Sequence, residues 1–173
     1  MDFQKFKDLV LDDQLLGYFA KKMEMPGDKV EVIVDEFLKY MLLADAKGEG
    51  SVPISQEVDD IWHFWILETS RYFQLCSVLP DGSYVHHTSE DYQSLTPDAE
   101  PLPAPTLVED VDEGFVEEPG EMLEEEPMLW LASYVANFGG FSKMALEFWP
   151  YAASLFKQSG HSLEEFNERL AAI

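Results

Sequence analysis

Apolar residues recur every three or four positions along the first part of the chain. One such stretch runs from residue 3 to residue 25 and is stopped by Pro26-Gly27. A second begins after Asp28, whose side chain suits a helix N-cap, and continues to about residue 46. This period puts the apolar residues of a helix on one face. The pattern therefore predicts two amphipathic helices, over 3–25 and over 29–46.

A third helix is predicted to start after Ser55, another suitable N-cap. Its apolar face consists of Val58, Ile61, Trp62, Trp65, Thr69, Tyr72, Phe73 and Cys76. These positions superimpose at about 100° per residue, so one continuous apolar stripe is expected along this helix. Pro80-Asp81-Gly82 then supplies a turn, and residues 83–88 should be extended or loop-like.

The helical period returns after residue 127. Segments 128–138 and 141–157 are predicted to be helices, and Trp149-Pro150 should interrupt the second because proline lacks a backbone N–H. Ser162 is the predicted N-cap of a last helix, with Glu165 completing a capping box.

Segment 97–127 differs in composition from the rest of the chain. Its 31 residues include 12 acids and six prolines, but no Lys, Arg or His. This composition is typical of a linker or a disordered loop. The acidic run is interrupted by Leu107, Val108, Val111, Phe115, Val116, Met122 and Leu123. The segment could therefore instead be a motif that docks on its own domain or on a basic partner.

Size and composition favour one domain with a substantial core. The chain has 173 residues, of which 46% are hydrophobic and 13% aromatic. The predicted organisation is a helical region over 1–96, the acidic Pro-rich linker or loop over 97–127, and C-terminal helices over 128–173 that pack on the first part. The predicted fold class is mainly α: a compact multi-helix domain with a long acidic Pro-rich loop and little or no β-structure.

The charge of the chain restricts its partners. There are 34 Asp and Glu against 11 Lys and Arg, a formal net charge of -23. Such a charge repels nucleic-acid phosphates and anionic lipids, so we expect neither nucleic acid nor membrane as a partner. An electrostatically attracted protein or peptide should be basic. Alternatively, the charge serves mainly solubility.

Several features predict a cytoplasmic location. Cys76 is the single cysteine, which excludes an intrachain disulfide and a Cys-rich zinc site. The first residues lack the basic region and apolar run of a secretory signal. No window approaches about 18 uninterrupted apolar residues, the length expected of a membrane-spanning helix.

The most informative block extends from residue 58 to residue 87. It reads Val58-Asp59-Asp60-Ile61-Trp62-His63-Phe64-Trp65-Ile66-Leu67-Glu68-Thr69, followed by Tyr72, Cys76 and Tyr84-Val85-His86-His87. The block resembles the glycine-rich domain-containing protein-like family, whose members carry a Val-Asp-x-x-Trp-His helix, a downstream Tyr and Cys, and a further His after a turn. The resemblance covers about 30 of the 173 residues, and the chain lacks the family's glycine-rich region. It implies a fold neighbourhood and no particular activity.

Asp59, His63 and the later histidines are the candidate metal ligands. Asp59 precedes His63 by one helical turn, so its carboxylate could hydrogen-bond the imidazole. Together with His86 or His87 they would supply two imidazoles and a carboxylate for a transition metal such as iron or zinc, with Asp59 as a ligand or as the group that orients His63. In the alternative interpretation, His63 packs against Trp62 and binds a backbone carbonyl, while His86-His87 closes the loop. The 22 residues between His63 and His86 are not an H-E-x-x-H type of spacing.

The aromatic residues and the cysteine of the block are predicted to be structural. Trp62 and Trp65 could wall a ligand pocket, but aromatic side chains at helical spacing usually form a core. Cys76 lies on the same stripe beneath Tyr72, where a thiol behaves as a small hydrophobe with a raised pKa.

The sequence contains no G-x-S-x-G elbow, P-loop, Rossmann glycine motif or H-E-x-x-H. The first functional hypothesis is therefore a non-catalytic accessory protein that binds a protein or peptide, for example a helper subunit of a metal-dependent peptide-modifying enzyme. The second is a metal- or small-ligand-binding protein that uses Asp59, His63 and His86 or His87. The third is an acidic inhibitor or immunity protein of a basic enzyme.

Overall fold

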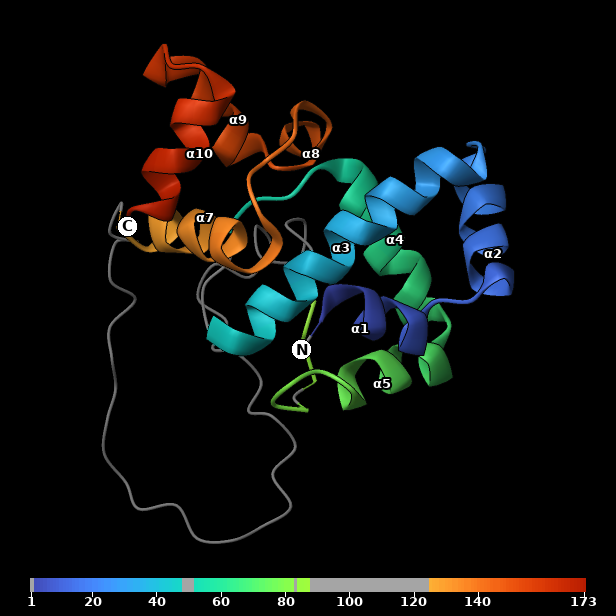
Figure 1. The fold of residues 1–173 in the computed structure, drawn as a ribbon. Coiled ribbons are helices and arrows are strands. Elements are labelled where there is room, and N and C mark those ends of the chain that lie inside the picture. The colour runs from blue at the N-terminus through green and yellow to red at the C-terminus, as the bar shows by residue number, and fades with distance from the viewer. Residues whose placement is uncertain (1, 48–51, 83, 88–124) are drawn as a thin grey trace, which may run out of the picture. The chain divides into compact units, whose positions relative to one another are not determined.

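The computed structural model describes residues 2–47, 52–82, 84–87 and 125–173 (Figure 1). Within these ranges the chain forms helices and no strand. The helices are α1 (Phe3–Val10), α2 (Asp13–Met23), α3 (Gly27–Lys47), α4 (Gln56–Leu67), α5 (Thr69–Ser77), α7 (Glu125–Phe138), α8 (Lys143–Phe148), α9 (Pro150–Ser159) and α10 (Leu163–Ala171). The prediction of a mainly α fold is confirmed, whereas most of the predicted acidic loop, up to residue 124, lies outside the described residues.

The chain divides into two units. The first comprises Met1–Val85 and Glu124–Ile173 and contains all the helices just named. The second comprises His86–Leu123, of which the structure describes His86 and His87. Across the described ranges, each helix is too short or too polar to cross a lipid bilayer.

The first predicted helix consists of two helices, α1 and α2, so the prediction of a single helix over 3–25 is wrong. The backbone is extended at Leu11 and Asp12, with φ angles of -114° and -120°. The Asp12 carboxylate accepts a hydrogen bond from the backbone N–H of Leu15 at 2.8 Å and thereby caps α2. An Asp side chain that binds nearby backbone N–H groups favours a helix start over a helix interior.

Helix α3 is the central helix of the first unit and contacts α1, α2, α4, α7 and α8 (Figure 1). Its largest fully buried side chains are Phe37, Leu38 and Met41. The helix begins at Gly27, so Asp28 lies in its first turn and is not the N-cap that the sequence suggested. The carbonyl of Pro26 instead accepts a hydrogen bond from the N–H of Val30 at 3.1 Å.

The third predicted helix is interrupted at Glu68, between α4 and α5. Glu68 has φ -89° and ψ 65°, outside the helical region. Its N–H donates to the carbonyl of Trp65 at 3.0 Å, and its own carbonyl accepts from the N–H of Tyr72 at 3.0 Å. The bend turns Phe73 outward, with 69% of its surface exposed, while Tyr72 and Cys76 remain buried. The predicted continuous apolar stripe is therefore wrong.

Two tryptophans fix α4 against its neighbours. The ring of Trp65 lies 5.2 Å from that of Phe19 on α2 and 5.4 Å from that of Phe37 on α3, measured between ring centroids. Trp62 packs against Tyr40 of α3 at 5.4 Å. Aromatic pairs of this kind contribute about 0.5–1.5 kcal/mol each beyond the burial of their area. Helix α4, which carries Asp59 and His63, is thus held rigidly on one face.

The C-terminal helices confirm two predicted boundaries. Trp149-Pro150 separates α8 from α9. Ser162 and Glu165 form the predicted capping box: the Ser162 N–H donates to Glu165 Oε2 at 2.9 Å, and the Glu165 N–H donates to Ser162 Oγ at 3.2 Å. Helix α7 begins at Glu125, earlier than the predicted residue 128.

Gly140 is a position where an added methyl group should destabilise the fold. A Cβ atom at Gly140 would come within 2.6 Å of Asn167 Nδ2. Asn167 is held in place, because its Oδ1 accepts from the Phe141 N–H at 2.8 Å and its Nδ2 donates to the Phe141 carbonyl at 3.0 Å. We expect Gly140→Ala to lower the free energy of unfolding, measured by urea denaturation, by about 1–3 kcal/mol.

Gly17→Ala is the matched control. Gly17 lies inside α2, and a Cβ atom there would meet nothing within 4 Å. Alanine should raise the free energy of unfolding by about 0.5–1 kcal/mol, because glycine disfavours a helix interior. Similar destabilisation by both substitutions would contradict the packing role assigned to Asn167.

Candidate functional site

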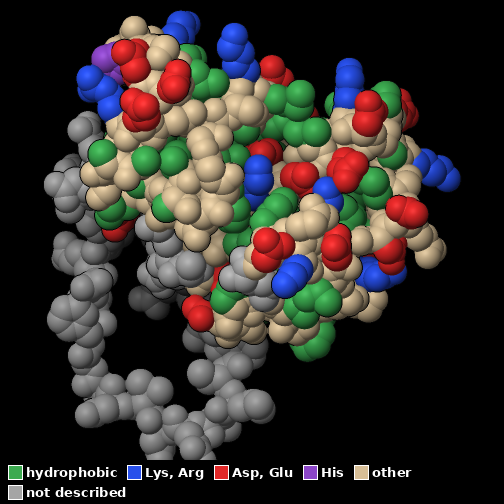
Figure 2. Space-filling model, in the orientation of Figure 1, with side chains coloured by type: hydrophobic (Ala, Val, Ile, Leu, Met, Phe, Trp, Pro, Cys, Tyr) green, Lys and Arg blue, Asp and Glu red, His purple; other side chains and the backbone are tan. Residues whose placement is uncertain are grey.

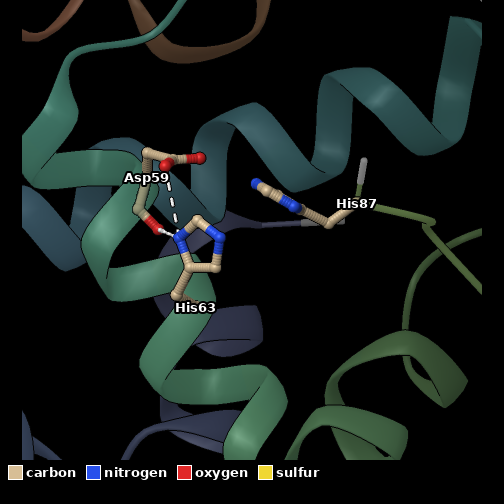
Figure 3. A group of neighbouring side chains, drawn as sticks. All are labelled: Asp59, His63 and His87. Carbon is tan, nitrogen blue, oxygen red and sulfur yellow. Dashed lines mark hydrogen bonds and ion pairs between the residues drawn. The ribbon is translucent and has the colours of Figure 1, made fainter. Parts of the chain in front are cut away.

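Asp59 and His63 lie one turn apart on α4, and their side chains meet (Figure 3). His63 Nδ1 is 3.2 Å from Asp59 Oδ2 and 3.0 Å from the backbone carbonyl oxygen of Asp59. The exposed fractions of the two side chains are 45% for His63 and 29% for Asp59. The pair is therefore positioned by a well-packed helix and is accessible from solvent.

The backbone contact assigns the tautomer of His63. A carbonyl oxygen can only accept a hydrogen bond, so Nδ1 carries the hydrogen in its bond to Asp59. The lone pair of the neutral imidazole is then on Nε2. Metal-binding histidines commonly have this arrangement, with one ring nitrogen on the metal and the other donating to a carbonyl or a carboxylate.

Tyr72 of α5 connects α4 to the segment that leads to the other two histidines. Its hydroxyl oxygen accepts a hydrogen bond from Trp62 Nε1 at 2.9 Å, and the hydroxyl donates to the Val85 carbonyl at 2.5 Å. Burial raises the pKa of Tyr72 far above its usual range, so the phenol keeps the proton that it donates. One hydroxyl therefore ties Val85 to Trp62, the residue before His63.

His86 and His87 follow Val85 directly. His86 is exposed and His87 is half-buried. Both belong to the second unit, whereas Asp59 and His63 belong to the first. The structure thus brings Asp59 and His63 together within one unit, and the anchored Val85 is the last residue before the second.

The other residues singled out from the sequence are buried in the first unit. The exposed fractions are 5% for Trp62, 0% for Trp65, 1% for Tyr72 and 3% for Cys76. Burial raises the pKa of the Cys76 thiol, so it stays protonated at neutral pH and is a poor nucleophile. These side chains lie on the buried faces of α4 and α5 and pack into the core.

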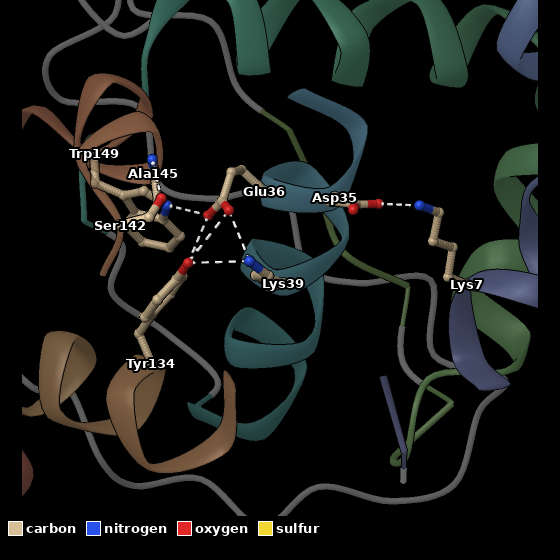
Figure 4. Close-up of polar contacts among 8 residues, drawn as sticks. All are labelled: Lys7, Asp35, Glu36, Lys39, Tyr134, Ser142, Ala145 and Trp149. Carbon is tan, nitrogen blue, oxygen red and sulfur yellow. Dashed lines mark hydrogen bonds and ion pairs between the residues drawn. The ribbon is translucent and has the colours of Figure 1, made fainter. Parts of the chain in front are cut away.

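A buried polar cluster surrounds Glu36 of α3 (Figure 4). The Glu36 carboxylate accepts hydrogen bonds from Trp149 Nε1 at 2.9 Å and from the Tyr134 hydroxyl at 3.0 Å, and it pairs with Lys39 at 2.7 Å. Burial, and then the neighbouring Glu36 carboxylate, raise the pKa of Tyr134 and keep it a donor. The cluster connects α3 to α7 and to the junction of α8 and α9, so its role is structural.

Sequence reasoning missed the Glu36 cluster, although a signal was present. Glu36 lies three residues after Ile33 and four before Tyr40, both buried, so it occupies the apolar face of α3. An acid in such a position requires buried donors. Tyr72 was singled out, but nothing in the sequence indicated that its hydroxyl bridges Trp62 and Val85.

Acidic side chains are spread over the visible face of the molecule, with Lys and Arg between them (Figure 2). Acids distributed in this way produce a diffuse negative field over that face. Such a field raises the local concentration of cations but does not select a position for one. Selectivity has to come from the geometry of particular ligands.

Tyr72→Phe should lower the free energy of unfolding by about 1–3 kcal/mol, because the substitution removes both hydrogen bonds of the buried hydroxyl. Tyr151→Phe is the control, since the Tyr151 hydroxyl has no hydrogen bond to another residue of the described ranges. It should change the stability by less than about 0.5 kcal/mol. Thermal and urea unfolding of the two variants would measure the difference, and equal stabilities would contradict the bridging role.

Comparisons of the chain with protein-family models, with curated proteins and with solved structures find no match. The resemblance of residues 58–87 to the glycine-rich domain-containing protein-like family stays a prediction. It marks the same helix on which the structure places the Asp59–His63 pair.

Proposed function

We propose that this protein binds a divalent transition metal ion through Asp59, His63 and His87. The observation that carries the proposal is the Asp59–His63 pair, in which the carboxylate and the backbone carbonyl of Asp59 lie 3.2 Å and 3.0 Å from His63 Nδ1 and orient the ring. The backbone bond to Nδ1 puts the lone pair of the neutral ring on Nε2, the nitrogen through which His63 would bind a metal. These three side chains, all among the described residues, could each offer one ligand atom to a metal ion. Two imidazoles and a carboxylate suit iron or zinc.

The chain connectivity supports His87 as the third ligand. Tyr72 anchors the Val85 carbonyl to Trp62, and His87 is two residues further along the chain. An extended residue spans at most about 3.6 Å, so the Cα atom of His87 stays within about 7 Å of that of Val85. His86 is the alternative second imidazole. His87→Ala should reduce metal binding more than His86→Ala, and the opposite order would transfer the role to His86.

The proposed activity is binding of the ion and not a particular reaction. Three protein ligands leave at least one position of a four-coordinate ion for water or for a group of another molecule. No catalytic motif accompanies the three residues in the sequence. If a partner protein supplied a ligand at this open position, the chain would be both a metal-binding protein and an accessory subunit.

A pair of matched substitutions separates specific binding from attraction to the acidic surface. Zn²⁺ titrated into the full chain by calorimetry, with Mg²⁺ present as a competitor, should give one site per chain. Asp59→Asn should weaken binding by about 10–100-fold, because it alters the group that binds the metal or orients His63. Asp60→Asn removes the same charge from the neighbouring residue, whose carboxylate accepts a hydrogen bond from Gln56 at 2.9 Å, and should change the affinity less than about threefold. Equal losses in both variants would contradict the proposal.

Binding of a partner protein through α1 and α5 is the second candidate function. Leu9 and Phe73 expose 57% and 69% of their surfaces, and the side chain of Gln74 donates to the Leu9 carbonyl at 3.2 Å, which joins the two helices. Neighbouring exposed apolar side chains are typical of contact surfaces. An accessory subunit would use such a surface, and an acidic inhibitor would require a basic partner. Copurification with the native chain and its loss in Phe73→Ser would support this candidate; a chain that stays monomeric and alone would oppose it.

A further inference from the structure

A cavity of about 420 Å³ lies among α7, α9 and α10 of the first unit. Leu155 of α9 and Phe166 and Leu170 of α10 form much of its apolar wall. Ligand sites in proteins typically measure about 300–1,000 Å³ and combine apolar walls with a few polar groups. This cavity falls at the small end of that range, and neither Asp59 nor His63 is among its lining residues.

The charges at the cavity are the reverse of those of the chain as a whole. Its lining includes Arg169 and His161 but no Asp or Glu, although the chain has 34 acids against 11 bases. Arg169 forms no ion pair with any carboxylate in the part of the chain that the structure describes, whereas Arg71 pairs with Asp12 at 2.6 Å. The Arg169 guanidinium can therefore pair with an anion bound in the cavity.

The carboxylate one helical turn before Arg169 on α10 takes part in the capping box. Glu165 lies one turn before Arg169 on α10, and its Oε2 accepts hydrogen bonds from the N–H and from the hydroxyl of Ser162, both at 2.9 Å. These bonds, of which the backbone bond has the larger effect, lower the pKa of Glu165, and the nearby charge of Arg169 lowers it further by a smaller amount. Glu165 thus has its own partners within the N-terminal turn of the helix.

We propose that this cavity binds an aliphatic carboxylate of medium chain length, such as decanoate. The hydrocarbon chain would lie against Leu155, Phe166 and Leu170, and the carboxylate would pair with Arg169. A guanidinium binds a carboxylate through two parallel hydrogen bonds, which gives it a preference over a neutral head group. The C-terminal ends of α9 and α10 carry about half a negative charge each, and Arg169, in the last turn of α10, offsets that of its own helix.

A comparison of head groups on one hydrocarbon chain tests the proposal. Calorimetric titration of the full chain with decanoate, decanol and decylamine, each below its aggregation concentration, should give the tightest binding for decanoate. Arg169→Gln should weaken decanoate binding by about tenfold or more, to the level of decanol, and leave decanol unchanged. Lys143→Gln on α8, which removes the same charge away from the lining, should alter decanoate binding less than about twofold. Equal affinities for decanoate and decylamine, or no binding of any of the three, would overturn the proposal.

A filled cavity locates the site independently. Leu155→Trp should abolish binding of both decanoate and decanol in protein whose circular dichroism spectrum is unchanged. If this variant does not fold, hexanoate replaces it as the probe: it should bind the native chain more weakly than decanoate, by up to about fourfold per buried CH₂ lost. Undiminished binding to the folded Leu155→Trp variant, or equal affinities for hexanoate and decanoate, would refute the location. His63→Ala should leave decanoate binding intact, so this proposal and the metal proposal fail or succeed separately.

Discussion

Replacing His63 with alanine should lower the affinity of the protein for Zn²⁺ by at least about 100-fold, because even the loss of a hydrogen-bond partner of a metal-bound histidine costs about 10–100-fold. The substitution removes the proposed Nε2 ligand itself. It also removes the hydrogen bond that His63 Nδ1 donates to the Asp59 backbone carbonyl at 3.0 Å. Because the His63 side chain is 45% exposed, its truncation should leave the fold intact.

His161→Ala is the matched control for this experiment. His161 belongs to the segment between α9 and α10 and is not among the three proposed ligands. Its removal should leave the Zn²⁺ affinity within about twofold of that of the native chain, because a half-buried imidazole outside the proposed ligand set contributes little to the site. A similar decrease in both variants would indicate diffuse binding by histidines, and an unchanged affinity in His63→Ala would remove His63 from the site.

The largest effect on stability is expected for Glu36→Ala. Glu36 is 3% exposed and accepts hydrogen bonds from Trp149 and Tyr134 while pairing with Lys39 (Figure 4). Its removal leaves a buried indole N–H without its acceptor and the ammonium of Lys39 without its carboxylate. Removal of one partner from a buried ion pair typically costs about 3–5 kcal/mol, and we expect a decrease of this size in the free energy of unfolding. Urea denaturation followed by tryptophan fluorescence would measure it.

Glu31→Ala provides the comparison on the same helix. The Glu31 side chain is 47% exposed and lies 2.8 Å from Lys7, which also pairs with Asp35 at 2.7 Å. Loss of this solvent-exposed pair should cost less than about 1 kcal/mol. A Glu36 variant no less stable than the Glu31 variant would show that the cluster does not hold α3, α7 and the α8–α9 junction together.

The helical periodicity was sufficient to predict the class of fold and most helix positions, but not the points where helices bend. The break between α1 and α2 depends on Asp12, the N-cap of α2. The sequence did not indicate which of the nearby acids, such as Asp8, Asp12 or Asp13, would cap a helix. No Gly or Pro near Glu68 indicates the bend in the sequence. There the packing of Tyr72 and Cys76 decides the direction of the backbone, and the same bend places Phe73 in solvent.

The contact within the candidate site was predictable because it is local. Residues four apart on a helix are neighbours, so the spacing of Asp59 and His63 suffices to bring them together. The hydrogen bonds made by Tyr72 and Glu36 join residues from different helices, and their partners depend on how the helices pack. Periodicity determines which residues are buried but not which buried donors meet which acceptors.

X-ray absorption spectroscopy of the full chain loaded with one equivalent of Zn²⁺ tests the metal-binding proposal most directly. The proposal predicts scattering from two imidazoles at about 2.0–2.1 Å, together with oxygen ligands, and a loss of imidazole scattering in His63→Ala. A spectrum with oxygen ligands only, or one that is the same for the native chain and for His63→Ala, would contradict it.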